Sequence, residues 1–123
     1  MKDKKIHSVD ELVDSRAVAL AIKHRIRPVE IIPGYLELAR QVASSGKLEM
    51  GLDEPRHILN EKIKQIVCGA ILCYELSHRQ VVILPSTQRG INANFHRSAS
   101  PEDYNHLGEY YENLVERLSS YGG

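Results

Sequence analysis

The chain has 123 residues, of which 42% are hydrophobic and 26% are charged, values that fit one globular domain and exclude a disordered or fibrous protein. Sixteen lysines and arginines balance sixteen acidic residues, which argues against a protein that coats nucleic acid through a broadly basic surface. No window reaches the ~18 to 20 apolar residues of a membrane span, and residues 1–5 lead into polar sequence. We therefore expect a cytoplasmic protein without membrane contact.

The N-terminal segment permits two structures. Ser8 and Glu11 form a capping box before an apolar run, which predicts a helix from Val9. The same stretch also fits two short strands around a turn at residues 10–11. Both interpretations stay open at this point.

Two helices joined by a tight basic turn come next. Ser15 is a candidate N-cap, and apolar residues at helical spacing predict a helix from about residue 16 to residue 23. Pro28 suits the first position of a second helix, because its fixed φ fits there and no hydrogen-bonding N–H is lost. This helix is expected to end near Gly46, and Pro33 inside it could kink or restart it. The expected inner faces contain Ala17, Val18, Ala21 and Ile22 in the first helix and Val29, Ile32, Leu36, Ala39 and Val42 in the second.

The segment "GKLEMGLDEPRHIL" is typical of a two-stranded hairpin. Leu48 and Met50 alternate with polar residues, a turn signal with Gly, Asp and Pro follows, and residues 57–59 supply a second short run. Asn60 is then expected to cap a helix from residue 61 to about residue 76. The apolar stripe of that helix comprises Ile63, Ile66, Val67, Ala70, Ile71 and Tyr74.

The C-terminal part is predicted as a strand, a loop and a helix. The run "RQVVILP" is rich in β-branched residues and indicates a largely buried strand, and residues 86–100 form a polar loop. Ser100 and Pro101, followed by two acidic residues, are a strong helix start. The expected inner face of this helix contains Leu107, Tyr110, Tyr111, Leu114, Val115 and Leu118.

The chain contains the stretches "LVDSRAVALAI", Tyr35 with the amphipathic run after it, "SGKLEM" and "ILNEKIKQIVCGAIL". These stretches resemble the phage regulatory protein family called Rha, over about residues 6 to 73. The resemblance implies a winged-helix regulator carried by a temperate phage. With the elements above it predicts an α+β fold in a single domain, residues 1–123. Residues 1–77 form a winged-helix-like helix-turn-helix part with a small hairpin, and residues 78–123 form the strand, the loop and the C-terminal helix.

The basic turn is the predicted contact with double-stranded DNA. At the N-terminus of a recognition helix, positive side chains reach base edges or phosphates, and Arg suits the acceptors of guanine better than Lys. A solvated turn with scattered charges is the other interpretation. The residues of this predicted site are Arg16, Lys23, His24, Arg25 and Arg27.

The loop at residues 86–100 and its flanks form an alternative site. Their hydroxyl, amide and guanidinium groups suit a nucleotide ligand or a host protein, although no phosphate-binding-loop motif is present. Such a site would serve a phage counter-defence or inhibitor protein that acts without catalysis. A plain surface loop is the other interpretation. The residues of the alternative site are Arg79, Thr87, Arg89, Asn92, His96 and Arg97.

The sequence predicts no metal site, no cofactor and no catalytic centre. Cys68 and Cys73 lie in an apolar helix and are expected to be reduced, inert thiols, at least one of them buried. The six histidines form no pair at metal-binding spacing, and no nucleophile motif occurs. We expect a binding protein rather than an enzyme.

The C-terminal helix is rich in tyrosine, at Tyr104, Tyr110, Tyr111 and Tyr121. These side chains either cover the core or form a contact in a homodimer, because Tyr is favoured where one end of the ring stays wet. A homodimer through this helix would suit a protein that reads two DNA half-sites.

Overall fold

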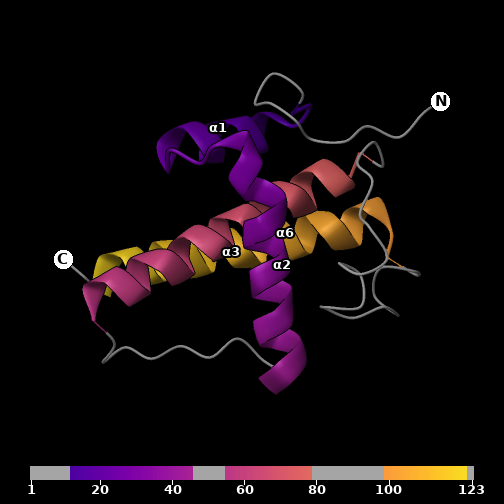
Figure 1. Cartoon of the computed structure of the whole chain (residues 1–123). Coiled ribbons are helices and arrows are strands. Elements are labelled where there is room, and N and C mark those ends of the chain that lie inside the picture. The colour runs from indigo at the N-terminus through magenta and orange to yellow at the C-terminus, as the bar shows by residue number, and fades with distance from the viewer. Residues whose placement is uncertain (1–11, 46–54, 79–98, 122–123) are drawn as a thin grey trace.

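The computed structural model describes residues 12–45, 55–78 and 99–121, which form four helices (Figure 1). In chain order these are α1 (Ser15–Lys23), α2 (Pro28–Ser45), α3 (Arg56–Leu76) and α6 (Pro101–Tyr121). The expected α+β, winged-helix-like fold is wrong, because the described ranges are helical and contain no strand. The two interpretations of the N-terminal segment, the first strand of the hairpin, and the strand and loop within residues 79–98 fall outside these ranges.

The expected second strand of the hairpin is the beginning of α3. Residues 57–59 lie in the first turn of α3, which starts directly after Pro55, so Asn60 lies inside the helix and does not cap it. The physical reason is packing. Leu59 and Ile63 are both buried and lie one turn apart, so an earlier start extends the buried stripe and outweighs the local capping preference of Asn60.

Helix α3 is the centre of the described structure. Its residues from Ile66 to Leu76 are buried on every side, which is the pattern of a helix surrounded by other helices. Helices α1, α2 and α6 all pack against it. Figure 1 shows α2 crossing α3 steeply, while α6 runs along α3.

Two glycines let neighbouring helices approach α3 closely. A Cβ atom added to Gly34 of α2 would lie 2.6 Å from Sγ of Cys68, and one added to Gly108 of α6 would lie 2.7 Å from Cε1 of Tyr74. Both distances are well below normal van der Waals contact. Only glycine therefore fits at these two crossings without a shift of the neighbouring side chain or helix.

Helix α1 spans almost the predicted residues, but its cap is Asp14 rather than Ser15. The Asp14 carboxylate accepts the backbone N–H of Arg16 at 2.8 Å and that of Ala17 at 3.3 Å. These bonds satisfy two N–H groups that have no partner inside the helix. The start of α1 is thus fixed by the same side chain that organises the polar cluster described below.

The turn after α1 is closed by its backbone. The N–H of Ile26 donates to the carbonyl of Ala21 at 2.9 Å, and the N–H of Arg25 donates to the carbonyl of Ile22 at 3.3 Å. This is the Schellman pattern of a helix end, and Arg25 occupies its left-handed position with a φ of 55°. Buried Ile26 then directs the chain into α2.

Helix α2 begins at Pro28, as predicted, and continues through Pro33 to Ser45 as one helix.

Helix α6 also begins as predicted. The hydroxyl oxygen of Ser100 accepts the N–H of Asp103 at 3.2 Å, and the Asp103 carboxylate accepts the N–H of Ser100 at 2.8 Å. This reciprocal pair satisfies two orphan donors of the helix start.

The inner face of α6 differs from the expected one at its tyrosines. Tyr110 is 53% exposed, whereas Tyr104 and Tyr111 are buried. Tyr104 and Tyr111 are seven residues apart and share one face, and Tyr110 is turned about 100° away from Tyr111. Tyr104 therefore belongs to the core and is not a spare surface residue for a homodimer.

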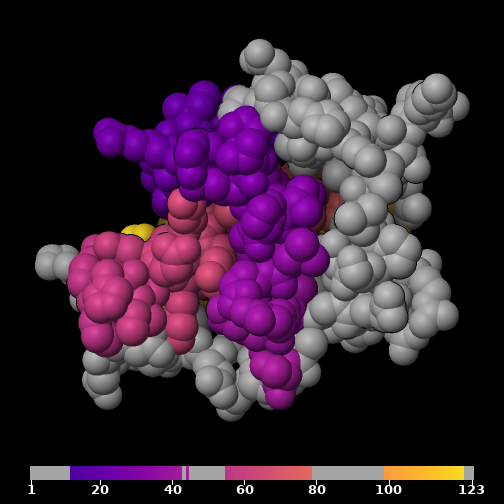
Figure 2. All heavy atoms as spheres, viewed as in Figure 1, coloured from indigo at the N-terminus to yellow at the C-terminus, as the bar shows by residue number. Residues whose placement is uncertain are grey.

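On the face drawn in Figure 2, α1, α2 and the first part of α3 form the described surface, and α6 is almost hidden. No helix in the described part of the chain combines the length and the apolar character that a membrane span requires.

Candidate functional site

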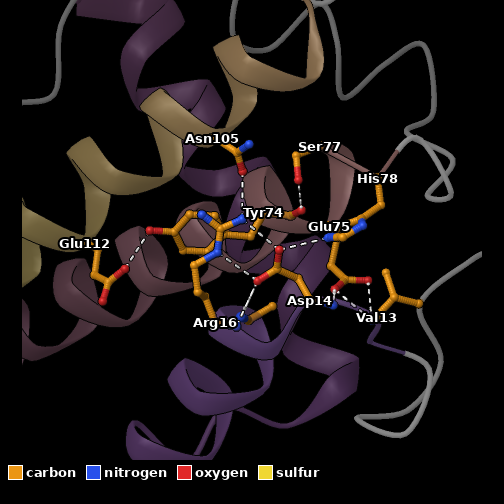
Figure 3. Close-up of polar contacts among 10 residues, drawn as sticks. Val13, Asp14, Arg16, Tyr74, Glu75, Ser77, His78, Asn105 and Glu112 are labelled. Atoms are coloured by element: carbon orange, nitrogen blue, oxygen red, sulfur yellow. Dashed lines mark hydrogen bonds and ion pairs between the residues drawn. The ribbon is translucent and has the colours of Figure 1, made fainter.

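A polar cluster joins the start of α1 to the end of α3 (Figure 3). At its centre the Asp14 carboxylate accepts hydrogen bonds from Nε and Nη2 of Arg16, at 3.0 and 2.8 Å. Nε2 of His78 lies 2.9 Å from Oδ2 of the same carboxylate, the oxygen that also accepts from Nη2 of Arg16. The Asp14 side chain is 5% exposed, so this charge is neutralised largely out of water.

Arg16 extends the cluster from α1 to α3 and α6. Its guanidinium group lies over the ring of Tyr74, 4.0 Å from the ring centroid, and donates to Oδ1 of Asn105 at 2.7 Å. The Tyr74 hydroxyl donates in turn to the Glu112 carboxylate at 2.6 Å. Burial and this hydrogen bond raise the pKa of Tyr74. Arg16 is thus held within the protein. Its Nε and Nη2 groups donate hydrogen bonds, and its guanidinium plane lies over the Tyr74 ring.

Glu75 is the most deeply buried charge among the described residues, at 1% exposure. Its carboxylate accepts the backbone N–H of Val13 at 2.9 Å and that of Asp14 at 2.8 Å (Figure 3). These bonds fasten the segment before α1 to the last turn of α3. Each polar group in the contact has a partner, which is the requirement for burying a charge.

The chemistry of the cluster is that of a structural clamp. Burial opposes ionisation of Asp14, but hydrogen bonds from Arg16 and His78 outweigh it and hold the pKa of Asp14 well below its usual range. The described ranges hold no group of three or more His, Cys, Asp or Glu side chains that could bind a metal ion. The charges at its centre are therefore engaged with one another and with the backbone of α1.

The other cations of the predicted DNA site lie around the turn between α1 and α2. Arg27 pairs with Glu30 at 2.9 Å through its guanidinium group, and its backbone N–H donates to the same carboxylate. Lys64 of α3 also pairs with Glu30, at 2.7 Å. Hydrogen bonds from Arg27 and then from Lys64 lower the pKa of Glu30 to about 2. One carboxylate thus compensates two cations.

Lys23 and His24 line a cleft of about 420 Å³ between α1 and α6. The opposite side of this cleft carries two carboxylates, Glu112 and Glu116, and its apolar wall includes Leu20. Burial, followed by the nearby charge of Lys23, lowers the pKa of His24. His24 therefore carries less positive charge at neutral pH than a free histidine.

Arg25 differs from the other members of the set. Its side chain is exposed, and it makes no ion pair with a residue in the described ranges. The residues at the two sides of the turn, Ile22 and Val29, are large apolar residues and are each 68% exposed. We refer to Ile22, Arg25 and Val29 as the turn patch.

The predicted DNA site is thus divided between four environments. Arg16 belongs to the polar cluster, Arg27 belongs to an ion-pair network with α3, and Lys23 and His24 line an acid-containing cleft. Only Arg25 faces solvent without a carboxylate close by among the described residues. The alternative site, Arg79, Thr87, Arg89, Asn92, His96 and Arg97, lies outside the described residues.

The two cysteines are buried and unpaired, as expected. Burial raises the pKa of the Cys68 thiol to about 12 and also raises that of Cys73. Cys68 lies at the inner end of a second cleft, of about 440 Å³, between α2 and α3. The thiolate, which is the reactive form, is scarce in both residues at neutral pH.

Comparison with known proteins yields no family. No family model matches the chain, and neither the curated proteins nor the solved structures contain a significant match. The resemblance to the Rha family stays an expectation from the sequence.

Proposed function

We propose that this chain is a non-catalytic binding protein that captures another protein through the turn patch. The observation that carries the proposal is the state of the cations around the turn. Arg16 and Arg27 are paired with carboxylates of the protein, whereas Arg25 has no ion-pair partner among the described residues and stands in the sequence between two exposed apolar residues. An inhibitor or adaptor acting on a host protein is the role that fits this surface.

The chemistry of the turn patch favours a protein partner over a phosphate backbone. Binding to DNA draws its affinity from several unpaired cations that each neutralise a phosphate. Interfaces between proteins are instead enriched in arginine and in apolar groups that become fully buried on binding. The turn patch has one arginine without an ion-pair partner in the described ranges, together with exposed Ile22 and Val29. This is the composition of a protein–protein interface.

The backbone at Arg25 supports a role for its side chain. The left-handed position that ends a helix is usually filled by glycine, and a residue with a Cβ there costs roughly 1 kcal/mol. Arg25 occupies it with a φ of 55°. Strained positions of this kind gather at functional sites, where the side chain is needed for contact.

A cytoplasmic location belongs to the same proposal. Cys68 and Cys73 are unpaired thiols, and reduced cysteines are typical of the reducing interior of a cell.

Recognition of double-stranded DNA by a phage-type regulator is the second candidate function. It is favoured by one observation, the succession of α1, a tight turn and α2, with exposed Lys23 and Arg25 at the turn. A helix-turn-helix of this order can place its second helix in a major groove. Against it stand Glu30 and Glu37 on α2, which pair with Arg27 and Arg40.

The proposal is tested by affinity capture with matched variants. Immobilised wild-type protein is expected to retain a specific protein from a bacterial host lysate, and Ile22→Asp and Val29→Asp should each abolish retention, because a charge replaces a buried apolar contact. Ile58→Asp is the control, since Ile58 is 39% exposed on α3 and lies outside the turn patch. A partner retained equally by all four proteins would refute the turn patch as the capture surface.

A further inference from the structure

The cleft between α1 and α6 has two walls of different character. Leu20 and Val115 make it partly apolar, and Glu112 and Glu116 supply two carboxylates that are one helical turn apart on α6. The Glu112 carboxylate already accepts the hydroxyl of Tyr74. Glu116 is exposed and makes no hydrogen bond or ion pair with the residues that the structure describes. The cleft therefore presents one carboxylate that is open to a new partner.

The described structure also carries an exposed cation without an ion-pair partner among the described residues, and it directly follows the residues that line one side of the cleft. Arg25 directly follows Lys23 and His24, which form one side of the cleft, yet its own side chain is exposed and has no ion-pair partner in the described ranges. The Schellman bonds at residues 25 and 26 fix the backbone of Arg25 so that it ends α1. Arg25 and Glu116 therefore do not form an ion pair with each other within one copy of the chain.

We propose that the cleft between α1 and α6 receives Arg25 of a second copy of this chain, and that the two copies exchange this side chain reciprocally. The aliphatic stem of Arg25 packs on the apolar wall formed by Leu20 and Val115, and its guanidinium group pairs with Glu116 and reaches Glu112. Arginine is the residue suited to such a site, because its stem tolerates burial while its planar head binds carboxylates in a fork geometry.

Arg25 and the cleft between α1 and α6 are neighbouring parts of one surface, which is why we propose a second copy of the chain as the molecule that fills the cleft. In a two-fold interface each copy offers the same surface, so a donor and an acceptor that lie side by side can meet the acceptor and the donor of the other copy. Arg25 and the cleft satisfy this condition, because Lys23 and His24 connect them. The contact would also cover Ile22, which is 68% exposed on the last turn of α1.

Charge supports this arrangement over a symmetric contact of α6 with itself. The face of α6 that borders the cleft carries exposed acids at seven-residue spacing, Glu102, Glu109 and Glu116, so two such faces repel each other. The cation of the turn removes that repulsion. Lys23 on the rim of the cleft opposes an incoming arginine, but the two carboxylates of the cleft outnumber it.

The dimer does not rest on the proposed capture of another protein, although both use Arg25. If both exist, the second copy covers the turn patch until a partner displaces it. The dimer is tested on pure protein without any partner, so its absence would not bear on the capture of another protein.

The test uses sedimentation velocity of the full chain over a range of concentrations, at low salt of about 20 mM and at about 500 mM. Wild type is expected to form a species of twice the 13.9 kDa chain mass at low salt, and the dimer should weaken at high salt. Arg25→Glu and Glu116→Arg should each weaken dimerisation at least about tenfold, because like charges then meet. Arg56→Glu, an exposed change at the start of α3, should leave it unchanged.

A mixture of the two variants tests whether Arg25 of one copy pairs with Glu116 of the other. An equimolar mixture of Arg25→Glu and Glu116→Arg contains one native pair and one reversed pair per mixed dimer, so dimerisation should return although each variant alone is monomeric. The double variant in one chain should dimerise for the same reason. A wild type that stays monomeric at low salt, or a mixture that stays monomeric while wild type dimerises, would overturn the proposal. Circular dichroism of each variant confirms that the helices remain.

Discussion

The backbone N–H of Asp14 donates to the carboxylate of Glu75 at 2.8 Å, across 61 residues of sequence, and so fixes the entrance of α1 on the last turn of α3. Asp14 in turn caps α1 and holds Arg16 and His78. The orientation of α1, and with it the position of the basic turn, therefore depends on a chain of polar contacts that begins at one buried carboxylate.

Glu75→Leu should destabilise the protein, because it leaves the N–H groups of Val13 and Asp14 buried without acceptors. The expected loss is about 2–3 kcal/mol in the free energy of unfolding, measured by urea denaturation. Glu61→Leu, an exposed change on the same helix, is the control and should stay within about 0.5 kcal/mol. Equal stability of the two variants would show that Glu75 does not fasten α1.

The stability of the protein should fall in acid, in part through Asp14. Its pKa in the folded state lies below the value of about 3.9 in an unfolded chain. The stabilisation by its ionised form is therefore complete above about pH 5 and is lost progressively as the pH falls below about 4. Urea unfolding midpoints measured from about pH 5 down to about pH 2 should drop less steeply for Asp14→Asn than for wild type. The exposed Glu102→Gln should keep the wild-type slope, and identical slopes for all three proteins would contradict the assignment.

Arg25→Gly should stabilise the monomer, because glycine adopts a φ of 55° without the clash of a Cβ atom. We expect a gain of roughly 0.5–1 kcal/mol in the free energy of unfolding, measured under dilute, high-salt conditions. Ala19→Gly, at an exposed position inside α1, should instead lose about 1 kcal/mol. A destabilised Arg25→Gly protein would mean that the side chain makes stabilising contacts that outweigh its backbone strain.

Gly34→Ala should destabilise the crossing of α2 and α3 by roughly 1–3 kcal/mol, because its new Cβ would overlap Sγ of Cys68. Cys68→Ala removes that sulfur atom but keeps the Cβ atom of residue 68, which would still lie 2.9 Å from the new Cβ, so the double variant should recover only part of the loss. The measurement is a double-mutant cycle of unfolding free energies. Simple additivity of the two changes would indicate that Gly34 and Cys68 are not in contact.

The local signals of the sequence identified most of the helices. Pro28 and the Ser100–Pro101 pair marked helix starts correctly, because capping depends on neighbouring residues alone. The start of α3 was placed wrongly, since residues 57–59 look like a short strand and their helical state depends on the burial of Leu59 against the rest of the fold. Tertiary packing determines where α3 starts, and a local sequence pattern carries no information about that packing.

The polar cluster was not predicted, because its partners are far apart in sequence. Glu75 and Asp14 are 61 residues apart, and Arg16 meets Asn105 across 89 residues. One signal was present: Glu75 is an acid within the otherwise apolar run "AILCYEL", and a charge in a buried helix requires a partner. The same cluster explains why Arg16, an apparent DNA contact by composition, is engaged within the protein.

We propose that the turn between α1 and α2 binds protein rather than nucleic acid, since Arg27 is paired with Glu30 and Lys23 borders a cleft that contains two carboxylates. Fluorescence anisotropy of a labelled duplex of random sequence, titrated with the protein at about 20 mM and about 200 mM salt, tests this directly. We expect no salt-dependent binding at protein concentrations up to about 100 μM, a range in which non-specific DNA-binding proteins bind. Binding that weakens steeply with salt and is lost in the Arg25→Ala, Arg27→Ala double variant would contradict it.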